Sequence, residues 1–102
     1  MMIVTVNRKD RCLEVQLKGE LDHHGAKSVM LQLEQEIELA LPLKLILNFQ
    51  GVTFMDSSGI AVVMRTHQRM RELGGSICLQ QVPTQPGKVF DAAGISRLVE
   101  ME

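Results

Sequence analysis

The sequence predicts an α/β fold, with a mixed, mainly parallel sheet of about five strands and helices packed on it. Two observations lead to this prediction. Apolar and polar residues alternate in some segments, as in half-buried strands, and apolar residues recur every three to four positions in others, as in amphipathic helices. The two kinds of segment also follow one another along the chain, which favours parallel strands joined by right-handed crossovers. Since no linker or low-complexity tract interrupts the 102 residues, we expect a single domain over residues 1–102.

The first half of the chain predicts two strands, a helix and a third strand. Residues 2–6 and 12–21 alternate between apolar and polar side chains, so they are interpreted as a strand pair with one partly wet face. From about Ala26 an apolar stripe with helical spacing predicts a helix, which Pro42 ends. Residues 43–49 are nearly continuous in apolar side chains, which is typical of a strand buried on both faces.

The second half predicts the remaining helices and strands. A second helix is expected over about residues 58–73, and the glycine pair that follows it suits a left-handed helix end. Residues 76–82 have the composition of a strand. A shorter helical segment around residues 88–93 and a short strand at residues 98–101 complete the predicted fold.

Composition and charge argue against several classes of function. Lys and Arg number 11 against 12 Asp and Glu, the net charge is −1, and Trp and Tyr are absent. We expect no nucleic-acid partner, because one requires a basic face or aromatic side chains on which bases stack. The two cysteines lie singly in apolar runs and are interpreted as reduced core residues. We find no signal peptide and no run of about 18 apolar residues, so we expect a cytoplasmic protein without membrane contact.

The segment at residues 52–64 carries the most specific information in the chain. Apolar residues lead into Asp56, Ser57, Ser58 and Gly59, and a stretch with helical spacing follows. Two hydroxyls and a carboxylate are therefore expected where a strand or loop turns into a helix. One interpretation is a simple N-cap, because side-chain oxygens accept the free N–H groups of a first helical turn. The other is that a serine accepts phosphate, because helix N-termini favour added negative charge.

Catalytic and metal-binding interpretations have little support in the sequence. A hydrolase nucleophile would read Gly-x-Ser-x-Gly, whereas the serines here follow Asp56, and no histidine has a strong claim as the base. The run also differs by one serine from the Asp-Ser-Gly loop of small aspartic proteases, which are almost entirely β. His23 and His24 form the one histidine pair, and a third metal ligand is lacking, since His67 lies on the inward stripe of another helix. We therefore expect no catalytic residue, metal or cofactor.

Three sequence blocks, in the same order and spacing, resemble the STAS-domain anti-sigma factor antagonists. The resemblance covers roughly residues 3–82, is strongest to the antagonists of the sporulation sigma-F pathway, and implies a STAS fold. The blocks are Gly19-Glu20-Leu21-Asp22-His23-His24, then Phe54-Met55-Asp56-Ser57-Ser58-Gly59-Ile60, and then Leu73-Gly74-Gly75.

The resemblance implies a switch controlled by phosphorylation rather than an enzyme. The serine directly after the aspartate, Ser57, is the implied phosphate acceptor, and the donor is an anti-sigma factor that is itself an ATP-using serine kinase. In this scheme the unphosphorylated protein binds the kinase and frees the sigma factor, phosphorylation ends the binding, and a serine phosphatase restores the free form. The implied partner-binding residues are Asp22, His23, Asp56, Ser57, Ser58, Gly59 and Ile60.

Alternatives remain open at this point. A STAS protein of a general stress pathway, or of a stressosome-like assembly, would carry the same blocks and serve another kinase. A small enzyme that uses a serine and an aspartate is the alternative from another class. The residues also leave Ile60 open, as either a core residue or a partner contact, and do not by themselves select Ser57 over Ser58.

Overall fold

The computed structural model describes residues 2–102, which form five strands, three α-helices and one 3-10 helix. The predicted α/β fold with a mixed, mainly parallel sheet is confirmed. In chain order the elements are β1 (Met2–Lys9), β2 (Cys12–Leu21), α1 (His23–Ala40), β3 (Lys44–Met55), α2 (Ser57–Glu72), β4 (Ser76–Gln80), α3 (Thr84–Ala93), η1 (Ile95–Arg97) and β5 (Glu100–Met101).

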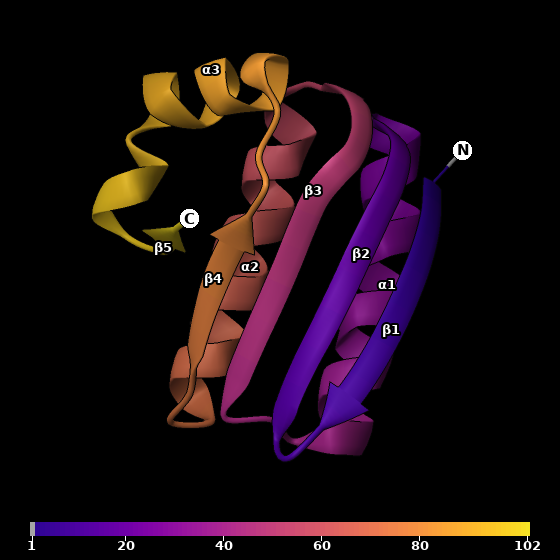
Figure 1. Ribbon diagram of the computed structural model, residues 1–102, viewed down its shortest axis with the longest axis vertical. Helices are drawn as coiled ribbons and strands as arrows, with labels where there is room; N and C mark the ends of the chain where they lie inside the picture. The colour runs from indigo at the N-terminus through magenta and orange to yellow at the C-terminus, as the bar shows by residue number, and fades with distance from the viewer. Residues whose placement is uncertain (1) are drawn as a thin grey trace.

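The strands form one sheet in the order β1-β2-β3-β4-β5, in which the β1–β2 pair is antiparallel and the other pairs are parallel. Figure 1 shows α1 and α2 behind the sheet, whereas α3 lies across its upper end. Because both long helices cover the same face, the prediction that residues 43–49 are buried on both faces holds only in part for the other face. There Lys44 is exposed, Ile46 is half-buried and Asn48 is buried.

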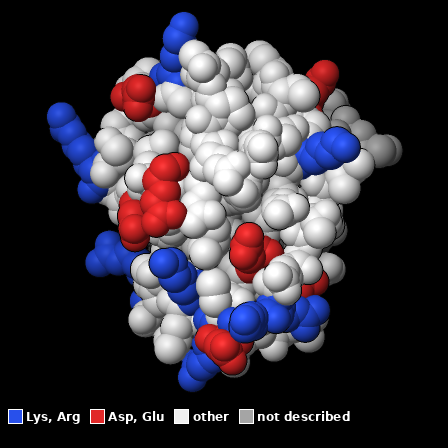
Figure 2. All heavy atoms as spheres, in the orientation of Figure 1, with Lys and Arg blue, Asp and Glu red and all other residues white. Residues whose placement is uncertain are grey.

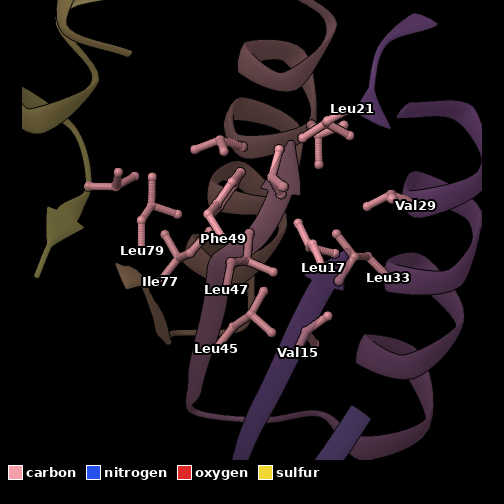
Figure 3. Packing of buried hydrophobic residues seen from close by; sticks show 14 of the residues in the cluster. Val15, Leu17, Leu21, Val29, Leu33, Leu45, Leu47, Phe49, Ile77 and Leu79 are labelled. Carbon is pink, nitrogen blue, oxygen red and sulfur yellow. The ribbon is translucent and has the colours of Figure 1, made fainter. Parts of the chain in front are cut away.

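The core lies between the sheet and the two long helices (Figure 3). Alternate strand residues point toward the helices because successive side chains of a strand face opposite sides of the sheet. Full burial of one such side chain contributes about 1.5–3 kcal/mol, so this layer determines how the helices sit on the sheet. The buried residues labelled in Figure 3 are Val15, Leu17 and Leu21 of β2, Leu45, Leu47 and Phe49 of β3, Ile77 and Leu79 of β4, and Val29 and Leu33 of α1.

Two helix bounds differ from the prediction, each for a local reason. α1 begins at His23 rather than near Ala26, because Asp22 caps the helix directly from the end of β2. α3 begins at Thr84 rather than near residue 88. Pro86 does not prevent this, because it falls in the first turn, where backbone N–H groups have no intrahelical partner.

Charged side chains are distributed without a broad region of one sign on the face shown in Figure 2, where Lys and Arg are interspersed with Asp and Glu. Two exposed ion pairs join α1 to α2, between Glu34 and Arg65 at 3.0 Å and between Glu38 and Arg69 at 2.6 Å. Exposed pairs of this kind contribute at most about 1 kcal/mol each. Within residues 2–102, no helix is long and apolar enough to span a membrane.

Candidate functional site

The ends of two neighbouring parallel strands bring two helix starts together. β2 and β3 pair up to Leu21 opposite Met55, and the next residues, Asp22 and Asp56, open α1 and α2. The backbone N–H of Asp56 donates to the carbonyl oxygen of Leu21, with 3.4 Å between nitrogen and oxygen. The first turns of α1 and α2 therefore lie at the same end of the sheet (Figure 1), and the positive ends of both helix dipoles lie there.

Each aspartate caps its helix in a similar way. Asp22 Oδ1 accepts a hydrogen bond from the backbone N–H of Gly25 at 2.8 Å, and Asp56 Oδ1 accepts one from Ser58 at 2.8 Å. The bond from Gly25 lowers the pKa of the Asp22 carboxyl below its usual value, because it stabilises the charged form. The N-cap interpretation of the Asp-Ser-Ser-Gly run is confirmed, and the capping residue is Asp56.

Ser57 and Ser58 differ in what they present to solvent. Ser57 is the first residue of α2 and is exposed. Ser58 is half-buried, its backbone N–H is occupied by Asp56, and it lines a groove between α1 and α2. An exposed hydroxyl on a first helical turn is accessible to another protein and lies in a field that favours an anion. The geometry therefore makes Ser57 the more accessible of the two hydroxyls.

Gly59 and Ile60 lie where α2 approaches the sheet most closely. A Cβ atom on Gly59 would collide with Cγ and Sδ of Met55 and would lie 3.2 Å from Cδ2 of Leu21. The absence of a side chain at Gly59 therefore lets the first turn of α2 pack directly on the strand ends. Ile60 is half-buried, packs against the core, and also lines a hollow beside Val89 of α3, so its position fits both interpretations.

The groove between α1 and α2 has a volume of about 450 Å³ and opens beside the candidate serines. It brings His23 of α1 onto the same surface as Ser58 of α2. Leu31, a residue with a relative exposure of 60%, adds an apolar contact surface to the wall of the groove. The other residues that line the groove are Ala26, Lys27, Met30, Glu34, Ala61, Val62 and Arg65.

Gln85 of α3 also belongs to this site, although no local pattern in the sequence marks it. Its Nε2 donates to the carbonyl oxygen of Met55 at 2.8 Å, and its Oε1 accepts from the N–H of Met55 at 2.8 Å. Gln85 thus holds the residue directly before Asp56 from 30 positions further along the chain. A glutamine in a helix is unremarkable as a sequence signal, because it is a common helix former.

The remaining side chains with reactive groups are histidines and cysteines, and of these only His23 lies on the same groove as Ser58 within residues 2–102. The rings of His23 and His24 are exposed, with centroids 5.8 Å apart, whereas His67 lies about 15 Å along α2 from Ser57. Cys12 and Cys78 are both free thiols, as predicted, although Cys12 is only half-buried. Burial raises the pKa of the Cys78 thiol, which favours its neutral form.

The sequence matches a protein family over nearly all of its length. The family described as the STAS domain matches residues 4–102. An anti-sigma F factor antagonist of Lysinibacillus sphaericus is 38% identical over 85 residues, covering 79% of this chain and 69% of that protein. An anti-sigma F factor antagonist of Paenibacillus polymyxa is 29% identical over 87 residues, covering 85% of this chain and 74% of that protein.

The structure is similar to that of the anti-sigma factor antagonist SpoIIAA, which has been solved in two forms. The unphosphorylated form superimposes with a TM-score of 0.84 and 25% sequence identity, covering 98% of this chain and 88% of SpoIIAA. The phosphorylated form, from Bacillus, superimposes with a TM-score of 0.75 and 25% identity over 98% of this chain and 91% of that chain.

Proposed function

This chain belongs to the STAS-domain family, and from that premise we propose that it is an anti-sigma factor antagonist switched by phosphorylation of Ser57. In its unphosphorylated form it binds an anti-sigma factor that is also a serine kinase, and the sigma factor is released. Phosphorylation ends that binding, and a serine phosphatase restores the binding form. The protein itself catalyses no reaction in this proposal.

The exposed position of Ser57 at the start of α2 is the observation that carries the proposal. The hydroxyl oxygen attacks the γ-phosphorus of ATP in the kinase, ADP leaves, and the hydroxyl proton passes to a base of the kinase. An exposed turn that the Asp56 cap already orders can enter a kinase site without unfolding of the domain. The two SpoIIAA forms support this chemistry, because that relative is described both with and without phosphate.

The position of the added phosphate explains how binding is reversed without a change of fold. Phosphorylation adds about −1.5 to −2 charges. These charges lie at the N-terminus of α2, where the helix dipole favours them. A partner carboxylate about 4 Å from the phosphate would be repelled by about 4 kcal/mol per unit pair at a surface-like dielectric constant. That energy corresponds to binding weaker by about a thousandfold.

The docking surface in this proposal is the end of the sheet where α1 and α2 begin. It contains the capped turns, the exposed Ser57, and the partly apolar groove that His23 and Ser58 line. Apolar lining of the groove supplies contact area, and the turn places the phosphate within that contact. The residues assigned to partner binding are Asp22, His23, Asp56, Ser57, Ser58, Gly59 and Ile60.

A phosphorylation experiment tests the proposal. The protein is incubated with ATP and the anti-sigma F factor of Lysinibacillus sphaericus, and the modified residue is located by mass spectrometry. We expect one phosphate on Ser57 in the wild type and in Ser58→Ala, and none in Ser57→Ala. Phosphate found on Ser58 instead, or on no residue, would contradict the proposal.

A binding experiment tests the switch separately from the modification. Calorimetry with the same anti-sigma factor should show that Ser57→Ala binds as the wild type does and that Ser57→Asp binds much more weakly. Ser96→Asp is the matched control, because it adds the same charge to an exposed serine in η1, away from both helix starts. Equal losses of affinity in Ser57→Asp and Ser96→Asp would show that net charge, rather than the position of Ser57, controls binding.

A further inference from the structure

β3 extends beyond β4 at the end that carries the serine turn. It pairs with β2 as far as Met55, but with β4 only from Lys44 to Asn48. The edge of β3 that faces β4 therefore has no strand partner beyond Asn48 among the described residues. Backbone groups in such a position need other hydrogen-bond partners, because unpaired N–H and C=O groups are costly in a packed protein.

Two side-chain amides supply hydrogen bonds along this part of β3. Asn48 Oδ1 accepts from the backbone N–H of Gln50 at 2.9 Å, just where β4 ends. Gln85 then engages both backbone groups of Met55, each at 2.8 Å. A primary amide carries one acceptor oxygen and a donor NH₂, as a peptide group carries one acceptor and one donor. The Gln85 side chain thus takes the place of the missing strand at the last residue of β3.

We propose that Gln85 is the positioning residue of the Ser57 turn, and that it couples α3 to the phosphorylation site. Its effect on phosphorylation rests on the proposed function above, whereas its effect on the turn does not. Gln85 fixes the peptide groups of Met55, and Met55 leads directly into Asp56, which is held in an extended conformation with φ −108° and ψ −167°. That conformation lets Asp56 Oδ1 reach the N–H of Ser58, so that Ser57 becomes the first helical residue.

The packing of α3 does not depend on Gln85, so the effect of Gln85 on the Ser57 turn can be tested without displacing the helix. Phe90 of α3 is fully buried, and its ring meets that of Phe49 edge to face, with centroids 5.3 Å apart and planes at 88°. Pro86 of the same helix is also buried. Because these contacts hold α3 on the sheet, a variant that loses only the Gln85 amide keeps the helix docked and loosens the turn.

Amide hydrogen exchange followed by NMR tests the first part of the proposal. Gln85→Met keeps the length of the side chain and removes both hydrogen bonds to Met55. We expect the amides of Ser58 and Gly59 to exchange roughly five- to 25-fold faster, because each bond of this kind shifts an equilibrium by about fivefold and two are lost. Amides of α3 should be unchanged. The matched control is Gln35→Met, an exposed glutamine of α1 whose side chain makes no hydrogen bond within residues 2–102.

A second variant tests whether the hydrogen bonds themselves are the cause. In Gln85→Glu the ionised carboxylate faces the carbonyl oxygen of Met55 and cannot donate to it. Once protonated, near the usual glutamate pKa of about 4.3, the carboxyl donates again. Exchange at Ser58 in this variant should therefore approach the wild-type rate below that pH, whereas Gln85→Met stays fast. If Ser58 in Gln85→Glu exchanges as fast as in Gln85→Met both above and below that pH, the proposal is overturned.

Kinetics with the anti-sigma F factor of Lysinibacillus sphaericus and ATP test the second part. Phosphorylation of Ser57 in Gln85→Met should fall about tenfold in kcat/KM, mainly in kcat, because most of the docking surface is intact. Faster amide exchange at Ser58 and Gly59 with an unchanged phosphorylation rate would overturn the coupling. Faster amide exchange in α3 alone would show that Gln85 only holds that helix in place. If the wild type is not phosphorylated at all, the proposed function fails, and the exchange experiment alone decides whether Gln85 holds the turn.

Discussion

Replacement of Gly25 by alanine tests the close approach of α1 to the sheet at the candidate site. Gly25 lies in the first turn of α1 and donates to the Asp22 cap. A Cβ atom there would collide with the carbonyl oxygen of Glu20 and would lie 2.7 Å from Cγ of Met2. The carbonyl belongs to the backbone of β2, so it cannot move aside without disturbing the strand pairing that holds the site.

The expected magnitude follows from two opposing terms. Alanine in place of glycine in a helix gains about 1 kcal/mol. Overpacking costs about 1–3 kcal/mol, and we take the upper value because backbone is in the way. Gly25→Ala should therefore lower the free energy of unfolding by about 2 kcal/mol. Gly87→Ala is the matched control, because its nearest neighbour would be Cγ1 of Val82 at 3.8 Å, an ordinary contact. That variant should be more stable than the wild type by about 0.5–1 kcal/mol.

Urea unfolding followed by circular dichroism measures both variants against the wild type. The two midpoints should shift in opposite directions with similar m-values, since the area exposed on unfolding hardly changes. In thermal unfolding, a change of 1 kcal/mol corresponds to about 5 °C for a domain of this size, so the two variants should differ by about 15 °C. A Gly25→Ala variant as stable as Gly87→Ala would refute the close approach of α1 to β2.

Three further predictions follow from single side chains. Asp56→Ala should lower the free energy of unfolding by about 1 kcal/mol in urea titrations, whereas Asp56→Asn, which keeps a capping oxygen, should change it little. Because the pKa of Asp22 is lowered in the folded state, its capping contribution is present above its unfolded pKa and is lost as pH falls through the folded one. Wild type should therefore lose more stability than Asp22→Asn between pH 7 and about pH 2, and equal losses would contradict this. Phe90→Ala should cost about 3–5 kcal/mol, because its fully buried ring packs on Phe49, and a much smaller loss in urea would show that α3 is loosely docked.

Local patterns in the sequence were sufficient for most of the fold. The alternation in residues 12–21 reflects a strand with one face on the core, and the stripe that begins near Ala26 reflects the buried side of α1. Gly74 follows α2 with a φ of +76°, a left-handed conformation near the predicted helix end. These signals are short in range, because they depend on the periods of strand and helix and on the backbone freedom of single residues.

Long-range contacts decided the features that these patterns did not predict. The apolar run at residues 43–49 does not reveal that α1 and α2 cover only one face of β3, because sequence period carries no information on which side a crossover helix packs. The role of Gln85 likewise has no local signal, because its hydrogen bonds to Met55 join residues 30 positions apart.

The sequence by itself determined the α/β class, the order of the elements, and the placing of a carboxylate and two hydroxyls at the start of α2, because period, capping and side-chain type are local properties. Only the tertiary structure decided that Asp22 and Asp56 start their helices at the same end of the sheet, that Ser57 is more exposed than Ser58, and that Gln85 reaches Met55. Those features depend on strand register and on packing between segments 30 or more residues apart, which local patterns do not encode.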